Sequence, residues 1–228
     1  MTSFLFTIQN PILRVASAFD FNHIKNNNKN SAHVNKYRRV FSYHCFPTME
    51  DLVTILSKKQ KHEKYIDEEF KIVDCFTIGK ETLEGFGNTL YNTHLSSNYA
   101  WYAKWSIYKY PEREVLALQT DHLWKDILHL NSLLGGNNDL LQGIIGHKFS
   151  HGSEFYKISS TLSQKGKEVI CCYIRSENEV YKHLIQKAAN LKPIEKKEAL
   201  DELDNDCRIP ESMRNETFSF INWRNDYC

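Results

Sequence analysis

The chain has 228 residues, of which 41% are hydrophobic, 13% aromatic and 25% charged. This composition excludes a wholly disordered chain and suffices for one compact domain. Lysine and arginine number 29 against 28 acidic residues, so the formal net charge of +1 gives no global signal for binding polyanions. With 9 glycines and 5 prolines, the chain is poor in the residues of Rossmann-type phosphate loops and turn-rich barrels.

The sequence predicts a cytoplasmic protein that does not enter the membrane. No apolar stretch approaches the roughly 20 residues that span a bilayer, so we expect no membrane partner. The first ten residues, MTSFLFTIQN, lack the basic start and apolar block of a signal peptide. The six cysteines include the adjacent pair Cys171 and Cys172 but no C-x-x-C motif. Without a secretory signal, they are predicted to be reduced thiols rather than a disulfide framework.

Two regions of different character are predicted along the chain. Residues 21–36 are polar, rich in asparagine and without periodicity, which is typical of a loop. We therefore expect residues 1–36 to be an N-terminal extension. Residues 37–228 are then a single domain, in which ordered structure begins.

Strands and helices follow one another in this domain without a regular βαβ rhythm. Alternating apolar and aromatic residues over 37–46 predict a strand that ends at Pro47. Thr48 and Asp51 form a near capping box, which predicts a short helix. Further strands are expected at 69–77, 114–120, 168–174 and 217–223, and further helices at 96–108, 122–134, 138–148, 177–189 and 194–206. The mixture favours the α+β class.

Three stretches follow one another in an order that resembles the ADP-ribosyltransferase superfamily, above all its toxin-like bacterial members. The first is FSYHCF, which carries His44, followed by MEDLVTIL. The second is SSNYAWYA, with Ser97, Tyr99 and Tyr102, followed by the strand EVLAL. The third is KEVICC, in which Glu168 opens a late strand. The resemblance implies a split antiparallel or mixed β-sheet core with flanking helices.

The resemblance also implies a toxin or antiviral defence effector that transfers ADP-ribose from NAD to a macromolecule, with nucleic acid favoured over protein as acceptor. An imidazole or guanidinium would orient the ribose hydroxyls of NAD, and an aromatic ring would stack on the nicotinamide. A carboxylate would stabilise the oxocarbenium-like transition state. The residues assigned to NAD are His44, Arg39, Ser97, Tyr99 and Tyr102, and the catalytic carboxylate is Glu168. NAD is then a consumed substrate, no metal is needed, and a neutralising antitoxin or chaperone is the implied partner.

Simpler interpretations of the same residues stay open. His44 alternates with aromatic residues and fits a half-buried histidine of a strand. The tyrosines fit core packing, which aromatic side chains dominate. Glu168 fits a solvated residue at the start of a strand. The family also has a Glu-x-Glu variant, which Glu177 and Glu179 match in spelling, although they precede a predicted helix rather than open a strand.

Three other classes of function are compatible with the chain. An RNase of the helical HEPN class has the signature Arg-x(4–6)-His, which Arg38 or Arg39 forms with His44. About one such match is expected by chance, and the chemistry needs a helix where we predict a strand. His147 and His151 have the i, i+4 spacing of two metal ligands, but no glutamate lies between them and glycines flank them. The third class is a non-enzymatic binding, adaptor or immunity protein.

Overall fold

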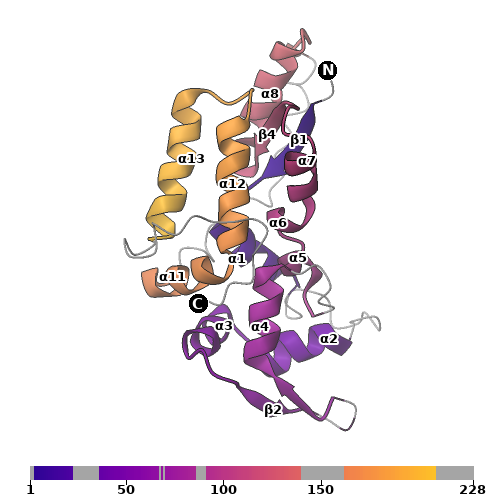
Figure 1. Cartoon of the computed structure of the whole chain (residues 1–228), viewed down its shortest axis with the longest axis vertical. Coiled ribbons are helices and arrows are strands. Elements are labelled where there is room, and N and C mark those ends of the chain that lie inside the picture. Colours follow the sequence, from indigo (N-terminus) through magenta and orange to yellow (C-terminus); the bar gives the residue numbers. More distant parts are fainter. Residues whose placement is uncertain are drawn as a thin grey trace.

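Helices make up most of the described structure and surround two small sheets (Figure 1). The structure is a computed structural model, and it describes residues 3–22, 36–66, 68, 70–85, 91–139 and 162–208. Its elements are β1 (Phe4–Ile8), α1 (Pro11–Asn22), α2 (Lys36–Arg39), the π-helix η1 (Val40–Cys45), α3 (Met49–Ser57), β2 (Glu63–Tyr65), β3 (Ile72–Asp74), α4 (Cys75–Glu84), α5 (Thr93–Ser96), α6 (Tyr99–Tyr102), α7 (Lys104–Lys109), β4 (Val115–Gln119), the 3-10 helix η2 (Thr120–His122), α8 (Leu123–Leu133), α11 (Gln164–Tyr173), α12 (Arg175–Lys187) and α13 (Pro193–Asp206). The predicted α+β class is confirmed, in a mostly helical form. None of the helices in these ranges is long and apolar enough to cross a bilayer.

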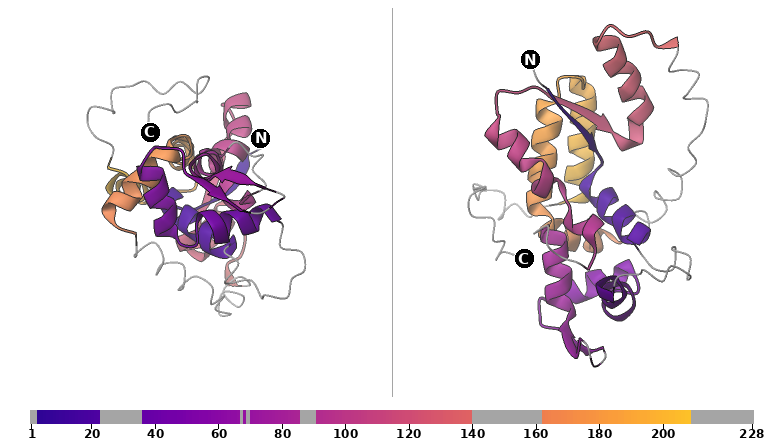
Figure 2. Two further views of the ribbon diagram at one scale, coloured as in Figure 1. Left: turned by 90° about the horizontal axis from the view of Figure 1, so that it is seen from below. Right: turned by 90° about the vertical axis from the view of Figure 1, so that its right-hand side faces the viewer.

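The two sheets of the described chain lie at opposite ends of the molecule (Figure 2). β1 and β4 pair in parallel, and β2 and β3 pair antiparallel. The other edge of β4 is covered by the turn after α12. There the Asn190 amide accepts from the Ala117 N–H at 2.8 Å and donates to the Ala117 carbonyl at 2.7 Å. Because β1 and β4 are parallel, the residues that follow Ile8 and Gln119 emerge at the same edge.

The prediction that residues 1–36 are an extension outside the ordered domain is wrong for β1 and α1. Ile8, Ile12 and Val15 are fully buried and belong to the same apolar core as the later helices. The sequence does not show that β1 belongs to the core, because β1 pairs with β4, which lies more than 100 residues further along the chain. Residues 23–35, which include most of the asparagine-rich stretch, lie outside the described residues.

The strand predicted over 37–46 is also wrong, since this segment is helical and forms α2 and η1. The Phe46 N–H donates to the Phe41 carbonyl at 2.7 Å, which is the i→i+5 bond of a π-helix. Val40, Phe41 and Cys45 are thereby buried on one side, and the rings of Phe41 and Phe46 meet edge to face at 4.7 Å. Packing of these side chains outweighs the strand preference of aromatic and β-branched residues.

The strand predicted over 168–174 is likewise wrong, because these residues belong to α11 and to the turn after it. Ser163 caps the helix by accepting from the Gly166 N–H at 3.1 Å. Gly166, Ile170 and Tyr173 are buried at the i, i+4, i+7 spacing of a helix. A seven-residue window of apolar residues is too short to show this period.

Elsewhere the predicted elements agree with the structure more closely. Thr48 and Asp51 form the capping box of α3, with the Asp51 N–H donating to Thr48 Oγ1 at 3.2 Å and the Thr48 N–H to Asp51 Oδ2 at 2.9 Å. β4, α8, α12 and α13 are confirmed. The helix predicted over 96–108 is divided into α6 and α7, with α5 immediately before it, and only the β3 portion of 69–77 is a strand. The elements predicted at 138–148 and 217–223 lie almost wholly outside the described residues.

The prediction of reduced thiols is wrong in this structure, which holds two disulfides between described cysteines. Cys45 pairs with Cys75, and Cys171 pairs with Cys207. Cys172 is disulfide-bonded as well. Packing of helices brings together cysteines that are 30 and 36 residues apart, so their spacing along the chain does not show the pairing. The disulfides join η1 to α4, and α11 to the end of α13.

Candidate functional site

The residues predicted to bind NAD are brought together only in part. Tyr99 and Tyr102 lie edge to face with their ring centres 5.6 Å apart, Tyr99 buried and Tyr102 39% exposed. Arg39 in α2 and His44 in η1 are both exposed. Ser97 is half-buried and lies just before α6. Glu168 is an exposed residue of α11. No hydrogen bond or ion pair between described residues joins Glu168 to any of the other five.

Tyr99 instead belongs to a buried ion-pair network between α1, α6 and α12. Arg14 Nη2 donates to Glu177 Oε2 at 2.7 Å, and Arg14 Nε pairs with the other carboxylate oxygen. The Tyr99 N–H donates to Glu177 Oε1 at 3.3 Å. Burial opposes the charge of Arg14, but the Glu177 carboxylate outweighs it and raises the Arg14 pKa. Glu177, one residue of the alternative Glu-x-Glu pair, has no exposed surface and holds three elements together.

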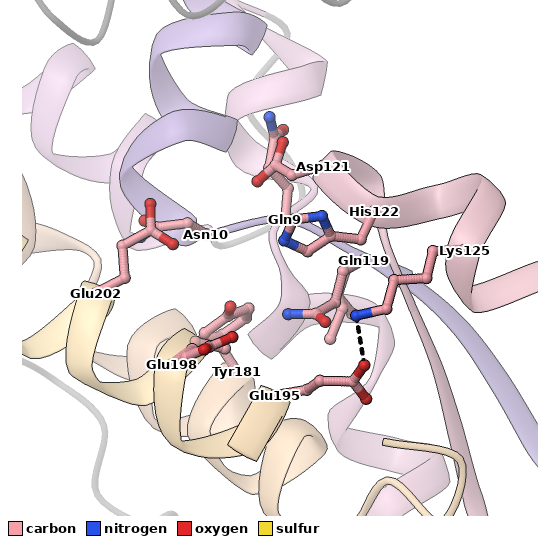
Figure 3. Close-up of a pocket in the computed structure, with 12 residues that line it drawn as sticks. Gln9, Asn10, Gln119, Asp121, His122, Lys125, Tyr181, Glu195, Glu198 and Glu202 are labelled. Atoms are coloured by element: carbon pink, nitrogen blue, oxygen red, sulfur yellow. Dashed lines mark ion pairs between the residues drawn. The ribbon is translucent and has the colours of Figure 1, made fainter. Parts of the chain in front are cut away.

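The described structure contains a cleft at the carboxyl ends of the parallel strands (Figure 3). Its volume is about 160 Å³, and it is open to solvent on one side. The ends of β1 and β4 form its floor, and η2, α8, α12 and α13 form its walls. The lining residues are Ile8, Gln9, Asn10, Gln119, Asp121, His122, Lys125, Tyr181, Glu195, Glu198, Ala199 and Glu202.

The cleft follows from the way in which helices begin after the two strands. Asn10 follows β1 and caps α1, its Oδ1 accepting from the Ile12 N–H at 2.9 Å. At the end of β4, the Gln119 N–H donates to Asp126 of α8 at 2.6 Å. The chain therefore turns away on both sides of the sheet edge and leaves space between the two helix starts. Crevices at the carboxyl ends of parallel strands are common ligand sites.

The charges that line the cleft are predominantly negative. Lys125 pairs with Glu195 at 2.6 Å, and this hydrogen bond lowers the Glu195 pKa. Asp121, Glu198 and Glu202 have no ion pair in the described structure. Burial raises the pKa of Glu202, and the neighbouring charges of Asp206 and Asp121 raise it further. Three carboxylates therefore face the same space with no cationic partner at contact distance.

Tyr181 connects the cleft to the buried network behind it. Its side chain is 2% exposed, and its ring stacks on Tyr99 with centres 6.3 Å apart. Burial and the charges of Glu202 and Asp121 raise the Tyr181 pKa, so the hydroxyl stays protonated at neutral pH. The hydroxyl is thus a donor and acceptor held in place by the core.

The chain matches no protein-family model, no curated protein and no solved structure. What the cleft does must therefore be inferred from its own residues. Among the residues that the structure describes, no three histidine, cysteine or acidic side chains are arranged to hold a metal ion. His147 and His151, considered as metal ligands from their spacing, lie outside the described residues.

One feature of the sequence is consistent with a binding site at this cleft, although it does not predict the cleft by itself. Gln119 is the last residue of β4, and Thr120, Asp121 and His122 follow it directly, as polar binding residues do at the end of a parallel strand. These residues line a cleft only because β1 pairs with β4, and the sequence predicts no strand at β1. The acidic side chains of 194–206 indicated only a polar helix.

The structure also bears on the RNase hypothesis. Arg39 and His44 lie on a helical segment, so the strand that counted against this hypothesis is absent. Arg39 is the last residue of α2, and His44 lies five residues later in the π-helix η1. Because one turn of a π-helix contains more residues than one turn of an α-helix, the two side chains lie closer to the same face than this spacing would give in an α-helix. Both side chains are exposed, and no polar contact joins them in the described structure. The pair is accessible, but it is not assembled into a site.

Proposed function

We propose that the cleft binds a small organic cation, of the class of polyamines and other amine-bearing molecules. The observation that carries the proposal is the position of Asp121, Glu198 and Glu202, which line one cavity without an ion pair in the described structure. A low-dielectric cleft lined by one sign of charge concentrates ligands of the opposite sign. The amides of Gln9 and Gln119 add hydrogen-bonding groups that fix the orientation of a bound molecule.

The same charges disfavour an anionic ligand in this cleft. The diphosphate of NAD would lie against three unneutralised carboxylates, with Lys125 already paired to Glu195. A neutral sugar can form hydrogen bonds in the cleft but has no net charge for the carboxylates to attract or repel. Comparing a cation, an anion and a neutral molecule therefore separates the effect of charge from simple occupancy of the cavity.

Thermal unfolding with spermidine, NAD and glucose tests the proposal. Spermidine should raise the melting temperature, because a ligand that binds only the native state stabilises it. Removing one carboxylate by Glu202→Gln should weaken spermidine binding about 5-fold, which corresponds to roughly 1 kcal/mol for charges in contact near water. Asp201→Asn is the matched control, since Asp201 is on the same helix but pairs with Lys197 at 2.6 Å outside the cleft. No stabilisation by spermidine, or equal stabilisation by glucose, would refute the proposal.

ADP-ribosyl transfer from NAD is the second candidate function. What supports it is the order of the three motifs and the exposed position of Glu168, whose carboxylate has no ion pair in the described structure. This carboxylate is accessible to a substrate, whereas Glu177 is enclosed with Arg14. The proposed acceptor is a nucleic acid or a protein, and an antitoxin or chaperone belongs to the same proposal.

Incubation with labelled NAD and separate pools of DNA, RNA and protein tests the second candidate. If Glu168 is catalytic, Glu168→Gln should lower turnover by about 10²–10⁴-fold with little change in NAD affinity. Glu179→Gln is the control for the alternative Glu-x-Glu motif formed by Glu177 and Glu179. Label transfer that survives Glu168→Gln in a folded protein would reject this site, and no transfer to any pool would reject the activity.

We further propose that the chain acquires its fold in an oxidising compartment, in place of the cytoplasm expected from the sequence. Structural disulfides persist in such compartments and are rare where thiols are kept reduced. The two described disulfides support this location. Thiol trapping after expression in the bacterial cytoplasm and periplasm tests it, since both disulfides should form fully only in the periplasm.

A further inference from the structure

The α13 wall of the cleft has little apolar anchoring of its own. This helix has 14 residues, of which Ala199 and Leu203 are buried and Leu200 is partly buried against the core. Glu195, Glu198 and Glu202 on the same helix line the cleft. Its position relative to β1 and β4 must therefore depend to a large extent on the contacts at its two ends.

The carboxyl end of α13 is fastened to α11 by a set of polar and covalent contacts. Cys207 forms a disulfide with Cys171 of α11. Lys167 Nζ pairs with Asp206 Oδ1 at 2.6 Å, and Gln164 Nε2 donates to the Asp206 carbonyl at 3.4 Å. Asp206 also accepts from Asn10 Nδ2 at 3.4 Å, which connects this end of the helix directly to the lining of the cleft.

The two described disulfides differ in their exposure. Cys171 is 6% exposed and Cys207 is 5% exposed, whereas Cys45 and Cys75 have no exposed surface. Thiol–disulfide exchange begins with attack of a thiolate on a disulfide sulfur, so its rate depends on access to that sulfur. We therefore expect a reductant to attack the disulfide at α13 more readily than the one between η1 and α4.

We propose that Cys171–Cys207 is a redox-sensitive clamp that holds the α13 wall of the cleft in place. A dithiol reductant, such as dithiothreitol or a protein of comparable chemistry, transfers two electrons and two protons to the disulfide. Its S–S bond breaks to give two cysteine thiols, and the dithiol closes to its own disulfide. The freed end of α13 then exchanges between docked and open positions. The consequence for ligand binding rests on the proposed function of the cleft, but the clamp itself does not.

Hydrogen exchange tests the clamp without any ligand. In the double variant Cys171→Ser/Cys207→Ser, amides of α13 should exchange at least 10-fold faster than in the oxidised protein. The matched control Cys45→Ser/Cys75→Ser removes the other disulfide and should leave α13 exchange within 2-fold of the unmodified protein. Unchanged exchange in α13 of the first variant, or equal acceleration in the control, would overturn the proposal.

The order of reduction is a second test that needs no variant and so does not depend on whether the variants fold. The native protein is treated briefly with dithiothreitol, the thiols are alkylated, and the labelled cysteines are identified by mass spectrometry. Cys171 and Cys207 should be labelled at least 10-fold faster than Cys45 and Cys75. Equal or reversed rates would overturn the proposal.

Spermidine binding then connects the clamp with the cleft. The oxidised protein should bind spermidine at least 5-fold more tightly than the variant that lacks Cys171–Cys207. If the oxidised protein does not bind spermidine, the proposed function fails, while the exchange and alkylation results still decide the clamp. If both forms bind equally, the clamp does not control the cleft and the proposal fails at that step.

Discussion

The Tyr99 hydroxyl and the backbone of Gln9 exchange two hydrogen bonds. The Gln9 N–H donates to the hydroxyl at 2.6 Å, and the hydroxyl donates to the Gln9 carbonyl at 3.1 Å. A side chain of α6 thus supplies both partners for Gln9, the residue that directly follows β1 and lines the cleft. The floor of the cleft is therefore held by the core.

Tyr99→Phe should destabilise the protein by about 1–3 kcal/mol, because it leaves the half-buried backbone donor and acceptor of Gln9 without their partners. Urea unfolding followed by circular dichroism measures the change. Tyr102→Phe is the control, since Tyr102 is 39% exposed and its hydroxyl has no such role, so we expect less than about 0.5 kcal/mol. Equal losses in the two variants would contradict the role assigned to the Gln9 bonds.

Glu177→Ala should be more damaging, with a loss of about 3–5 kcal/mol, because it leaves the Arg14 guanidinium charged and buried without its partner. The double variant Arg14→Met/Glu177→Leu should be less destabilised than the sum of the single changes, since no lone charge remains. Glu179→Ala, two residues on and half-buried, serves as the control in the same urea series. Additive losses would show that the two charges do not act as a pair.

Asp74 should make stability depend on pH in the acid range. It caps α4, and its carboxylate accepts from the His62 N–H at 2.8 Å and from Thr77 Oγ1 at 2.7 Å. Burial by itself would raise the Asp74 pKa, but these hydrogen bonds outweigh it and lower the pKa. The stabilisation is therefore complete above the unfolded pKa of about 4 and is lost as the pH falls through the lower folded value.

Asp74→Ala should cost about 1 kcal/mol at pH 7, the usual value for a lost helix cap. The variant should also lose less stability than the native protein between pH 5 and acid unfolding, because the titrating group is gone. Urea unfolding at a series of pH values measures both effects. Parallel pH profiles for the two proteins would reject Asp74 as a source of the acid dependence.

Binding of a cation in the cleft should weaken as the pH falls. Glu202 has a raised pKa, so its charge is lost at a higher pH than that of an ordinary glutamate. Spermidine affinity measured by calorimetry should decrease as the pH falls through this raised value, and the decrease should be smaller in Glu202→Gln. Asp201→Asn should keep the native profile, and an affinity independent of pH would exclude carboxylates as the binding groups.

The elements that the sequence alone determined are those whose signals are local. The capping box of Thr48 and Asp51 fixes the start of α3, because both partners lie within one turn. The apolar run of β4, the amphipathic pattern of α12 and the polar, helix-favouring composition of α13 are likewise local signals. In these segments local preference and tertiary packing favour the same conformation.

Where local preference and tertiary packing favour different conformations, tertiary packing determines the structure. The segments 37–46 and 168–174 have strand-like composition, but burial of Phe41 and Ile170 against neighbouring helices makes both helical. β1 exists as a strand because β4 lies beside it, and the two disulfides form because helices bring distant cysteines together. The cleft is the clearest case. Its lining comes from four segments that are far apart in the sequence, at 8–10, 119–125, 181 and 195–202. Most of the negative charge of the cavity is present only when α13 packs over the edge where β1 and β4 end.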